Sequence, residues 1–170
     1  MTTQKRKPKV LDMGAHAFPH PRATHAVDIV SKRSVQYTAD KDPDAHDKRE
    51  KPYGYTTKKI LENRLKKIDY RFNFNYNTQK LPWSNNYFDT IYSQGSLYAY
   101  GKPFAYKEIH RVLKHGGRLI YDIGDTKEKL EKHFKMLKEI GFTSGNIHGV
   151  GTYMYKGEKR ISGKMWVYKK

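Results

Sequence analysis

The sequence predicts an α/β fold: a doubly wound, mostly parallel sheet in a single domain, closed by a C-terminal antiparallel hairpin. Two observations carry this prediction. Short apolar or alternating segments, typical of strands, recur between segments with helical spacing. The last stretch, residues 142–170, is punctuated by Gly and rich in Tyr and β-branched residues, which favours paired strands. A chain of 170 residues suits one such domain.

The N-terminal third contains two short apolar segments, at residues 9–14 (KVLDMG) and 25–30 (HAVDIV), which we interpret as buried strands. The connection between them, AHAFPHPRAT, contains Pro19 and Pro21, so it is predicted to be an irregular loop rather than a helix. Residues 36–55 mix charges of both signs with Pro and Gly, and they are expected to form a mobile loop.

The middle of the chain alternates between the two kinds of spacing. Thr56 or Thr57 is expected to cap a basic helix that runs to about Ile68. Residues 70–76 (YRFNFNY) alternate as a strand with two different faces does, and residues 88–93 (FDTIYS) read as a further strand.

The C-terminal half repeats the pattern with clear stop signals. A helix is predicted over 104–114, followed by Gly116-Gly117 and a strand over 118–123. Asp125 or Thr126 is expected to cap the next helix, which runs to Ile140 and ends at Gly141. The closing hairpin is expected to turn at 156–159.

Strands joined by helical crossovers form a parallel sheet covered on both faces. Ligands of such sheets bind beyond the carboxyl ends of the strands, where the strand order reverses. The loops after Asp12, Asp28, Tyr76 and Ser93 are therefore the predicted site.

Charge and composition limit the function classes. Lys and Arg number 34 against 17 Asp and Glu, a net charge of +17, and this favours a polyanionic partner, with RNA preferred to DNA. Residues 1–8 form a predicted basic arm before a domain over 9–170. Cys is absent, which excludes disulfides, thiolate zinc sites and Cys nucleophiles and favours the cytoplasm. No apolar segment is long enough to cross a membrane, so no membrane partner is expected.

Two acids end the first two predicted strands, Asp12 and, sixteen residues later, Asp28. Gly14 after the first strand allows the backbone to approach a ligand, and an acid after the second strand can accept the hydroxyls of a ribose. Two buried strands that merely end in exposed acids would give the same pattern.

Two longer motifs add specificity. Residues 81–91 (LPWSNNYFDTI) and 106–120 (YKEIHRVLKHGGRLI) resemble the segments that enter the fourth strand and form the following helix, Gly-Gly turn and fifth strand of class I S-adenosylmethionine-dependent methyltransferases. This family is Rossmann-like, and the chain is similar to its type 11 methyltransferases over about residues 9–140. The resemblance implies S-adenosylmethionine as cofactor and S-adenosylhomocysteine as product.

The resemblance also implies roles for individual residues. Asp12 and Gly14 fall on the motif beside the methionine part of the cofactor. Asp28 matches the acid that holds the ribose, and Ile29 lies beside it against the adenine. Asn77 matches an acid that contacts the adenine amino group, and an Asn oxygen can accept the same hydrogen bond. Ser93 would border the reacting methyl group.

The first motif departs from the family, because Asp12-Met13-Gly14-Ala15-His16 keeps one of the usual three glycines. We expect a Pro-containing loop in place of the first helix, with His16, His20 and His25 lining the cofactor loop and making it more basic below about pH 6.5. Prolines between these histidines and the absence of Cys disfavour zinc, so no metal site is predicted.

The acceptor is poorly marked. Tyr98, Tyr100 and His110 are candidates for its pocket, although packing explains each of them as well, and no catalytic residue is assigned. The leading hypothesis is a methyltransferase that acts on a nucleic acid, with RNA favoured, and a partner protein could supply acceptor recognition. The alternatives are an inactive relative that serves as a basic nucleic-acid-binding or assembly subunit, and a methyltransferase for a small molecule or a protein.

Overall fold

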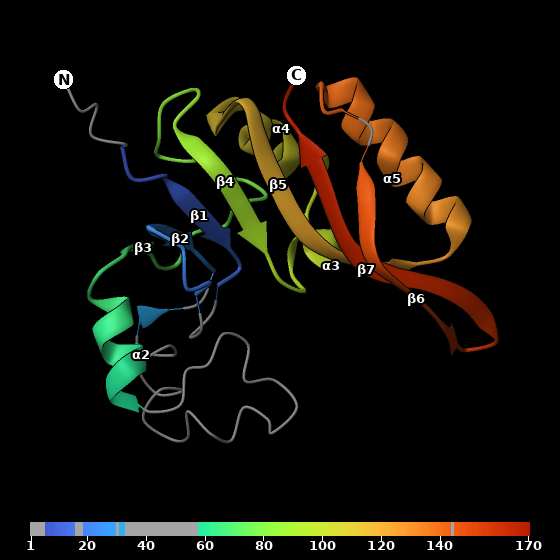
Figure 1. The fold of residues 1–170 in the computed structure, drawn as a ribbon, viewed down its shortest axis with the longest axis horizontal. Helices are drawn as coiled ribbons and strands as arrows, with labels where there is room; N and C mark the ends of the chain where they lie inside the picture. The colour runs from blue at the N-terminus through green and yellow to red at the C-terminus, as the bar shows by residue number, and fades with distance from the viewer. Residues whose placement is uncertain (1–5, 16–18, 30, 33–57, 144) are drawn as a thin grey trace.

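One seven-stranded sheet organises the computed structural model, which describes residues 6–15, 19–29, 31–32, 58–143 and 145–170 (Figure 1). The strand order is β3-β2-β1-β4-β5-β7-β6. Neighbours from β3 to β5 are parallel, whereas β7 is antiparallel to both β5 and β6. The strands are β1 (Val10–Met13), β2 (His25–Val27), β3 (Asp69–Arg71), β4 (Phe88–Ser93), β5 (Leu113–Asp125), β6 (Asn146–Tyr155) and β7 (Glu158–Tyr168).

The helices lie on different sides of this sheet. Helix α2 (Lys58–Leu65) packs its last residue, Leu65, with Ala26 and Tyr70 of β2 and β3. Helices α3 (Leu97–Tyr100), α4 (Pro103–Val112) and α5 (Lys127–Ile140) contribute to the larger core on the other face. The topology is thus the predicted Rossmann-like one, with the closing hairpin at one edge.

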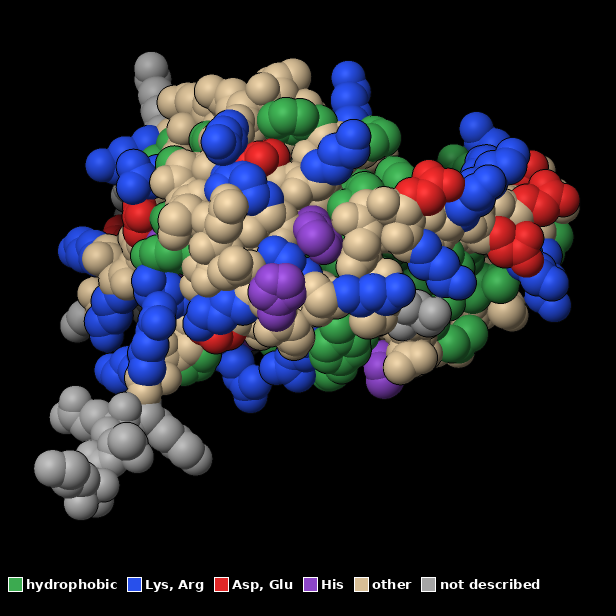
Figure 2. Space-filling model, turned by 90° about the horizontal axis from the view of Figure 1, so that it is seen from above, with side chains coloured by type: hydrophobic (Ala, Val, Ile, Leu, Met, Phe, Trp, Pro, Cys, Tyr) green, Lys and Arg blue, Asp and Glu red, His purple; other side chains and the backbone are tan. Residues whose placement is uncertain are grey.

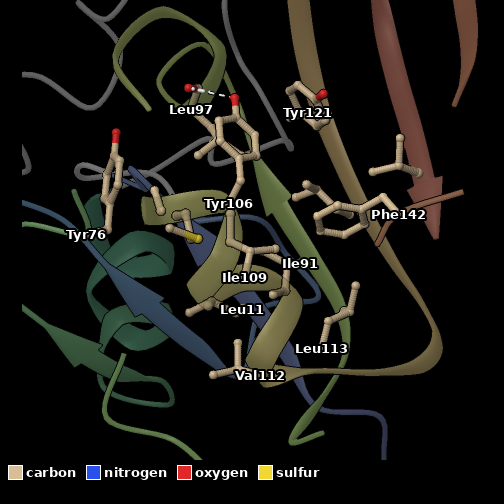
Figure 3. Close-up of a cluster of buried hydrophobic side chains, with 14 of the residues drawn as sticks. Leu11, Tyr76, Ile91, Leu97, Tyr106, Ile109, Val112, Leu113, Tyr121 and Phe142 are labelled. Atoms are coloured by element: carbon tan, nitrogen blue, oxygen red, sulfur yellow. Dashed lines mark hydrogen bonds between the residues drawn. The ribbon is translucent and has the colours of Figure 1, made fainter. Parts of the chain in front are cut away.

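The larger core forms because alternate residues of each strand point to the same face. Ile109 and Val112 of α4 and Leu137 of α5 are buried against Leu119 and Met165 of the sheet. Figure 3 shows part of this cluster. Tyrosines take part because their hydroxyls have partners: Tyr106 donates to the Leu97 carbonyl oxygen at 3.1 Å, and Tyr121 bonds His133 Nε2 at 2.6 Å.

Most predicted elements are confirmed. The strand over 88–93 and the helix that ends at Ile140 match the structure, with Gly141 at φ 113° as its left-handed cap. The hairpin turns at Lys156 and Gly157, inside the predicted segment. The strand predicted over 25–30 ends at Val27, and the helix predicted to reach Ile68 ends at Leu65. The loop predicted over 36–55 lies outside the described residues.

The strand predicted over 70–76 is wrong beyond Arg71. Asn73 adopts a left-handed conformation with φ 54°, which a strand cannot continue through. The Phe74 amide then donates to the Asp28 carbonyl oxygen at 2.8 Å instead of pairing along β3. The alternation of YRFNFNY therefore marks a short edge strand followed by a turn.

The helix predicted over 104–114 also needs correction, because it ends at Val112 and Leu113 already pairs with Phe88. The chain reaches the regular part of β5 through Gly116, which has φ 72°. The four-residue helix α3 was not predicted, since LYAY carries too little periodicity to distinguish it from a loop.

An ion pair on α4 connects the two sequence motifs, residues 81–91 and 106–120, in the folded structure. Glu108, only 8% exposed, accepts from the Leu81 amide at 2.8 Å and pairs with Arg111 at 2.7 Å. Arg111 also donates to the carbonyl oxygens of Leu81 and Trp83, each at 2.8 Å. We call Glu108 and Arg111 the α4 clamp, because they fix the segment that enters β4.

The surface is basic at the edge of the sheet where β1 and β4 begin. Figure 2, a view of this edge, shows more Lys and Arg side chains than Asp and Glu. None of the helices in the described ranges is long and apolar enough to cross a membrane.

Candidate functional site

A cavity of about 370 Å³ lies where β1 and β2 end, at the predicted carboxyl edge of the sheet. Its size falls within the usual range for small-molecule sites. Eight residues from four separate segments line it: Gly14, Asp28, Ile29, Asn75, Tyr76, Asn77, Ser96 and Tyr100. Four of them, namely Gly14, Asp28, Ile29 and Asn77, were predicted as cofactor contacts, and Tyr100 was a candidate for the acceptor pocket.

Gly14 makes the turn after β1. Its φ is 73°, and its amide donates to the Val27 carbonyl oxygen at 2.9 Å. A Cβ at this position would overlap the Ser96 hydroxyl, which donates to the Met13 carbonyl oxygen at 3.1 Å. Both the conformation and the close approach therefore require Gly. The one retained glycine of the motif is the one that this turn needs.

Asp28 is held by the backbone on both sides. Its amide donates to the Arg71 carbonyl oxygen at 3.2 Å, and its carbonyl oxygen accepts from Phe74 at 2.8 Å. These bonds fix the residue after β2, so its side chain lines the cavity while remaining 7% exposed. Next to it, Ile29 is 63% exposed, an apolar side chain on an open rim. A carboxylate beside an apolar surface suits a sugar joined to a flat aromatic base.

The third wall is a turn that contains Asn75 and Asn77. The Asn75 side chain accepts from the Asn77 amide at 3.0 Å. The Asn77 side chain bridges to α3: its Nδ2 donates to Tyr100 at 2.9 Å and its Oδ1 accepts from the Lys102 amide at 2.7 Å. Asn77 therefore holds two walls of the cavity together, and its Oδ1 retains a second lone pair for a ligand.

Two lining residues that sequence reasoning missed belong to one hydrogen-bonded group. Tyr76 is 8% exposed, and burial raises the pKa of its hydroxyl, with the hydrogen bond to Ser96 acting in the opposite direction. The signal for Tyr76 was its position at the end of YRFNFNY. Nothing in the sequence marked Ser96 beyond its place after Gly95.

Ser93, also a predicted site residue, does not line the cavity. It is 3% exposed and lies behind Ser96, with the two hydroxyl oxygens 3.0 Å apart. Its oxygen also accepts from the Leu97 amide at 3.1 Å. Ser93 thus supports the start of α3 and positions Ser96.

Asp12 lies on the opposite face of the sheet from the larger core, in register with Ala26 and Tyr92. Its carboxylate accepts from the His20 amide at 2.6 Å. Burial raises the pKa of Asp12 to about 7, although the His20 hydrogen bond lowers it in part. Asp12 therefore anchors the proline-containing connection and is absent from the cavity lining.

The predicted role of the histidines requires correction. Burial lowers the pKa of His20 to about 4, and it also lowers the pKa of His25. The His20 ring stacks on Tyr92 at 3.8 Å, and His25 packs edge-on against Trp83 and Phe88. The pKa of about 4 leaves His20 neutral near pH 6.5, and burial moves the protonation of His25 to lower pH as well. His16 lies outside the described residues, and the described part of the chain groups no three His, Asp or Glu residues as a metal would require.

Of the three candidates for the acceptor pocket, one reaches the cavity. Tyr100 lines it and is 72% exposed. Tyr98 instead donates to Asp125 Oδ2 at 3.2 Å, and burial raises the pKa of its hydroxyl. His110 packs edge-on against Phe142, between α4 and the end of α5. An acceptor that reaches the cavity would pass Tyr100.

Comparisons with known proteins identify other chains with a similar fold. The profile of a methyltransferase-domain family matches residues 55–121. Among solved structures, the chain is similar to CrArsM, an arsenic(III) S-adenosylmethionine methyltransferase from Chlamydomonas reinhardtii, with a TM-score of 0.65, 14% identity and coverage of 96% of this chain and 64% of that one.

Two further structures are similar over nearly all of the chain. For YcgJ from Bacillus subtilis the TM-score is 0.62 and the identity 12%, with coverage of 96% of this chain and 93% of that one. For the [4+2]-cyclase SpnF the TM-score is 0.62 and the identity 15%, with coverage of 95% of this chain and 75% of that one. At such low sequence identity, these structural similarities establish the fold alone. A search of curated proteins finds no match.

Proposed function

We propose that this chain transfers a methyl group to a nucleic acid, with RNA preferred to DNA as the acceptor. The chain has the fold of class I S-adenosylmethionine-dependent methyltransferases and matches a methyltransferase-domain family, and both findings indicate S-adenosylmethionine as the cofactor. The observation that carries the methyltransferase proposal is the cavity at the carboxyl ends of β1 and β2, with the Asp28 carboxylate inside it.

The cavity residues fit the adenosine part of this cofactor. The Asp28 carboxylate can accept from both ribose hydroxyls, and Ile29 offers an apolar surface for the adenine. The free lone pair of Asn77 Oδ1 can accept from the adenine amino group. Gly14 makes the turn that places the end of β1 at the cavity, with the Ser96 hydroxyl packed against it.

When bound in the cavity by Asp28, Ile29 and Asn77, this cofactor would supply an activated methyl group to an acceptor lone pair. The task of the protein is placement, since an aligned nucleophile needs little further assistance. Tyr100 stands at the cavity rim, where it can contact the acceptor.

The net charge of +17 supports an RNA acceptor, since a strongly positive body attracts polyanions. A small-molecule acceptor, as in the arsenic methyltransferase, would leave that charge unused.

Thermal unfolding with and without S-adenosylmethionine or S-adenosylhomocysteine tests the cofactor site. Ligand at 100 times its dissociation constant adds about 2.7 kcal/mol, which raises the Tm by several degrees for a domain of this size. Asp28→Ala is expected to abolish the shift while keeping the fold. Asp122→Ala is the matched control, because it removes a half-exposed carboxylate on β5, away from the cavity. An equal shift in the Asp28 variant would contradict the site assignment.

A second candidate function is a non-catalytic subunit that binds nucleic acid. The observation that favours it is the Ser96 hydroxyl packed against Gly14, which narrows the end of the cavity nearest β1. This alternative predicts that neither cofactor form shifts the Tm, whereas RNA binding persists and weakens with salt.

A further inference from the structure

The side of the sheet opposite α3–α5 carries a second feature, on the strands β5, β7 and β6. Leu119, Tyr121 and Met165 of β5 and β7 face the larger core with the helices. Their sequence neighbours therefore point to the opposite side. None of the helices α2–α5 packs there over β5 and β7, and in Figure 1 these strands lie in front of α4. We call this side the open face, defined by Arg118, Asp122, His148, Lys164 and Trp166.

The sequence of β7 shows that this face suits contact with water or a polar partner. Along the strand, Lys164, Trp166 and Tyr168 alternate with the buried Met165 and Val167. Such alternation is typical of a sheet with one solvated side, whereas a sheet covered on both sides has nearly continuous apolar strands.

An aromatic ring lies at the centre of the open face. Register places Trp166 opposite Ile120 of β5 and Asn146 of β6. The Arg118 guanidinium lies 5.5 Å from the Trp166 ring centre, and the His148 ring lies 4.7 Å away. Trp166 Nε1 is shielded from solvent and has no hydrogen-bond partner among the described residues.

Positive charges flank this ring. Lys164 is 49% exposed and pairs with Asp122 only loosely, at 3.7 Å. Further along the same side of the hairpin, Tyr153 pairs with Arg160, whose guanidinium lies 4.6 Å from the Tyr155 ring centre. Tyr153 can lie across β5 there because Gly124 has no side chain. From Trp166 to Arg160 the strand spans about 20 Å.

We infer that the open face binds single-stranded RNA, with bases stacked on Trp166, Tyr153 and Tyr155 and phosphates held by Arg118 and Lys164. Stacking rings interleaved with cations are the features that single-stranded RNA requires of a protein surface. The inference deepens the proposed function, because it assigns the recognition of an RNA acceptor to a surface apart from the cofactor cavity. Such a surface can bind without cofactor.

The first test is fluorescence anisotropy of a labelled 12-nucleotide single-stranded RNA, without cofactor, at several salt concentrations. The variant Arg118→Gln/Lys164→Gln removes two charges from the open face. The variant Lys132→Gln/Lys135→Gln removes two from the exposed side of α5 and is the matched control. We expect the first to weaken binding by about tenfold and to reduce the salt slope by about 1.4, and the control to change affinity less than twofold. Equal weakening by both, or no binding by the wild type, would overturn the inference.

The second test separates stacking from charge. Trp166→Leu is expected to weaken RNA binding by about fivefold or more while leaving the binding of inorganic polyphosphate unchanged. Equal losses for both ligands in a folded variant would contradict stacking. If Trp166→Leu does not fold, the charge variants alone decide.

Sedimentation distinguishes an RNA surface from an interface between two copies of the chain. A dimer that Arg118→Gln/Lys164→Gln dissociates would assign the open face to a second copy and overturn the RNA inference. The cofactor thermal shift is independent of these outcomes. A shift that persists in a protein without RNA binding contradicts the open-face inference and the RNA acceptor but keeps the cofactor site, whereas its absence together with RNA binding contradicts only methyl transfer.

Discussion

Asp12 and Asp28 end neighbouring strands, yet their surroundings give them different tasks. The Asp12 side chain is fully enclosed and bonded to the His20 amide, so it holds the proline-containing connection in place of a first helix. The Asp28 side chain is presented to a cavity by two backbone hydrogen bonds. The same residue type thus serves folding at one strand end and ligand binding at the next.

The raised pKa of Asp12 gives a pH-dependent stability. Between its unfolded value of 3.8 and its folded value of about 7, the native state keeps a proton that the unfolded chain releases, so this group lowers stability as pH rises. His20 and His133 each have a pKa of about 4 and have the opposite effect on stability. Up to about pH 6.5 they make stability rise with pH, because the unfolded chain holds protons that the native state lacks.

Asp12→Asn removes the loss of stability that Asp12 causes as pH rises. Its side-chain oxygen can still accept the hydrogen bond from the His20 amide. We expect its free energy of unfolding to rise with pH more steeply than that of the wild type from pH 4.5 to 6.5, by up to about 1.4 kcal/mol per pH unit. Urea unfolding across this range measures the difference, with Asp122→Asn as a half-exposed control. Parallel profiles for Asp12→Asn and the wild type would disprove the assignment.

At the scale of elements, the α4 clamp joins a helix to the loop that precedes β4. Burial raises the pKa of Glu108, but the Arg111 hydrogen bond and the Leu81 amide outweigh it, so the net pKa is lowered and the carboxylate stays charged. The planar fork of Arg111 reaches several acceptors at once, as an ammonium group cannot. This shared network joins the two sequence motifs in the folded structure.

Arg111→Lys is expected to lower the free energy of unfolding by about 3 kcal/mol, because Glu108 would remain buried with a poor partner. Urea denaturation measures the loss. Arg22→Lys, at an exposed position in the loop before β2, should change stability by less than about 0.5 kcal/mol. A clamp variant as stable as that control would show that the loop is held by packing alone.

Particular residues show how far sequence reasoning reaches. Period-two segments such as FDTIYS and strong stops such as Gly141 identify their elements because the pattern and the backbone agree. Gly14 and Asp28 were found because they follow strands, and Asn77 was found through the family resemblance. Ser96 was not, because its approach to Gly14 depends on tertiary packing. The strand predicted over 70–76 failed at Asn73, because the residue type alone does not reveal that its backbone is left-handed.

For the whole molecule, the net charge of +17 opposes compaction. The screening length falls from about 30 Å at 0.01 M salt to about 10 Å at 0.1 M, so repulsion across the body weakens.

We expect the Tm to rise by a few degrees between 10 and 150 mM NaCl at constant pH. Sodium fluoride at equal ionic strength should give the same rise, because screening does not depend on the anion. A flat or falling Tm would mean that close ion pairs outweigh the repulsion. A rise confined to one anion would point to specific binding.

The strand order has a consequence for synthesis on the ribosome. β1 lies between β2 and β4, and Lys9 bonds to Asp89, a partner 80 residues later. β1 can pair with β2 early, but its other edge gains a partner only when β4, past the middle of the given sequence, has been made, whereas β5, β7 and β6 come later and pair with near neighbours. Until then, one edge of β1 stays unpaired and open to contact with other molecules around the ribosome.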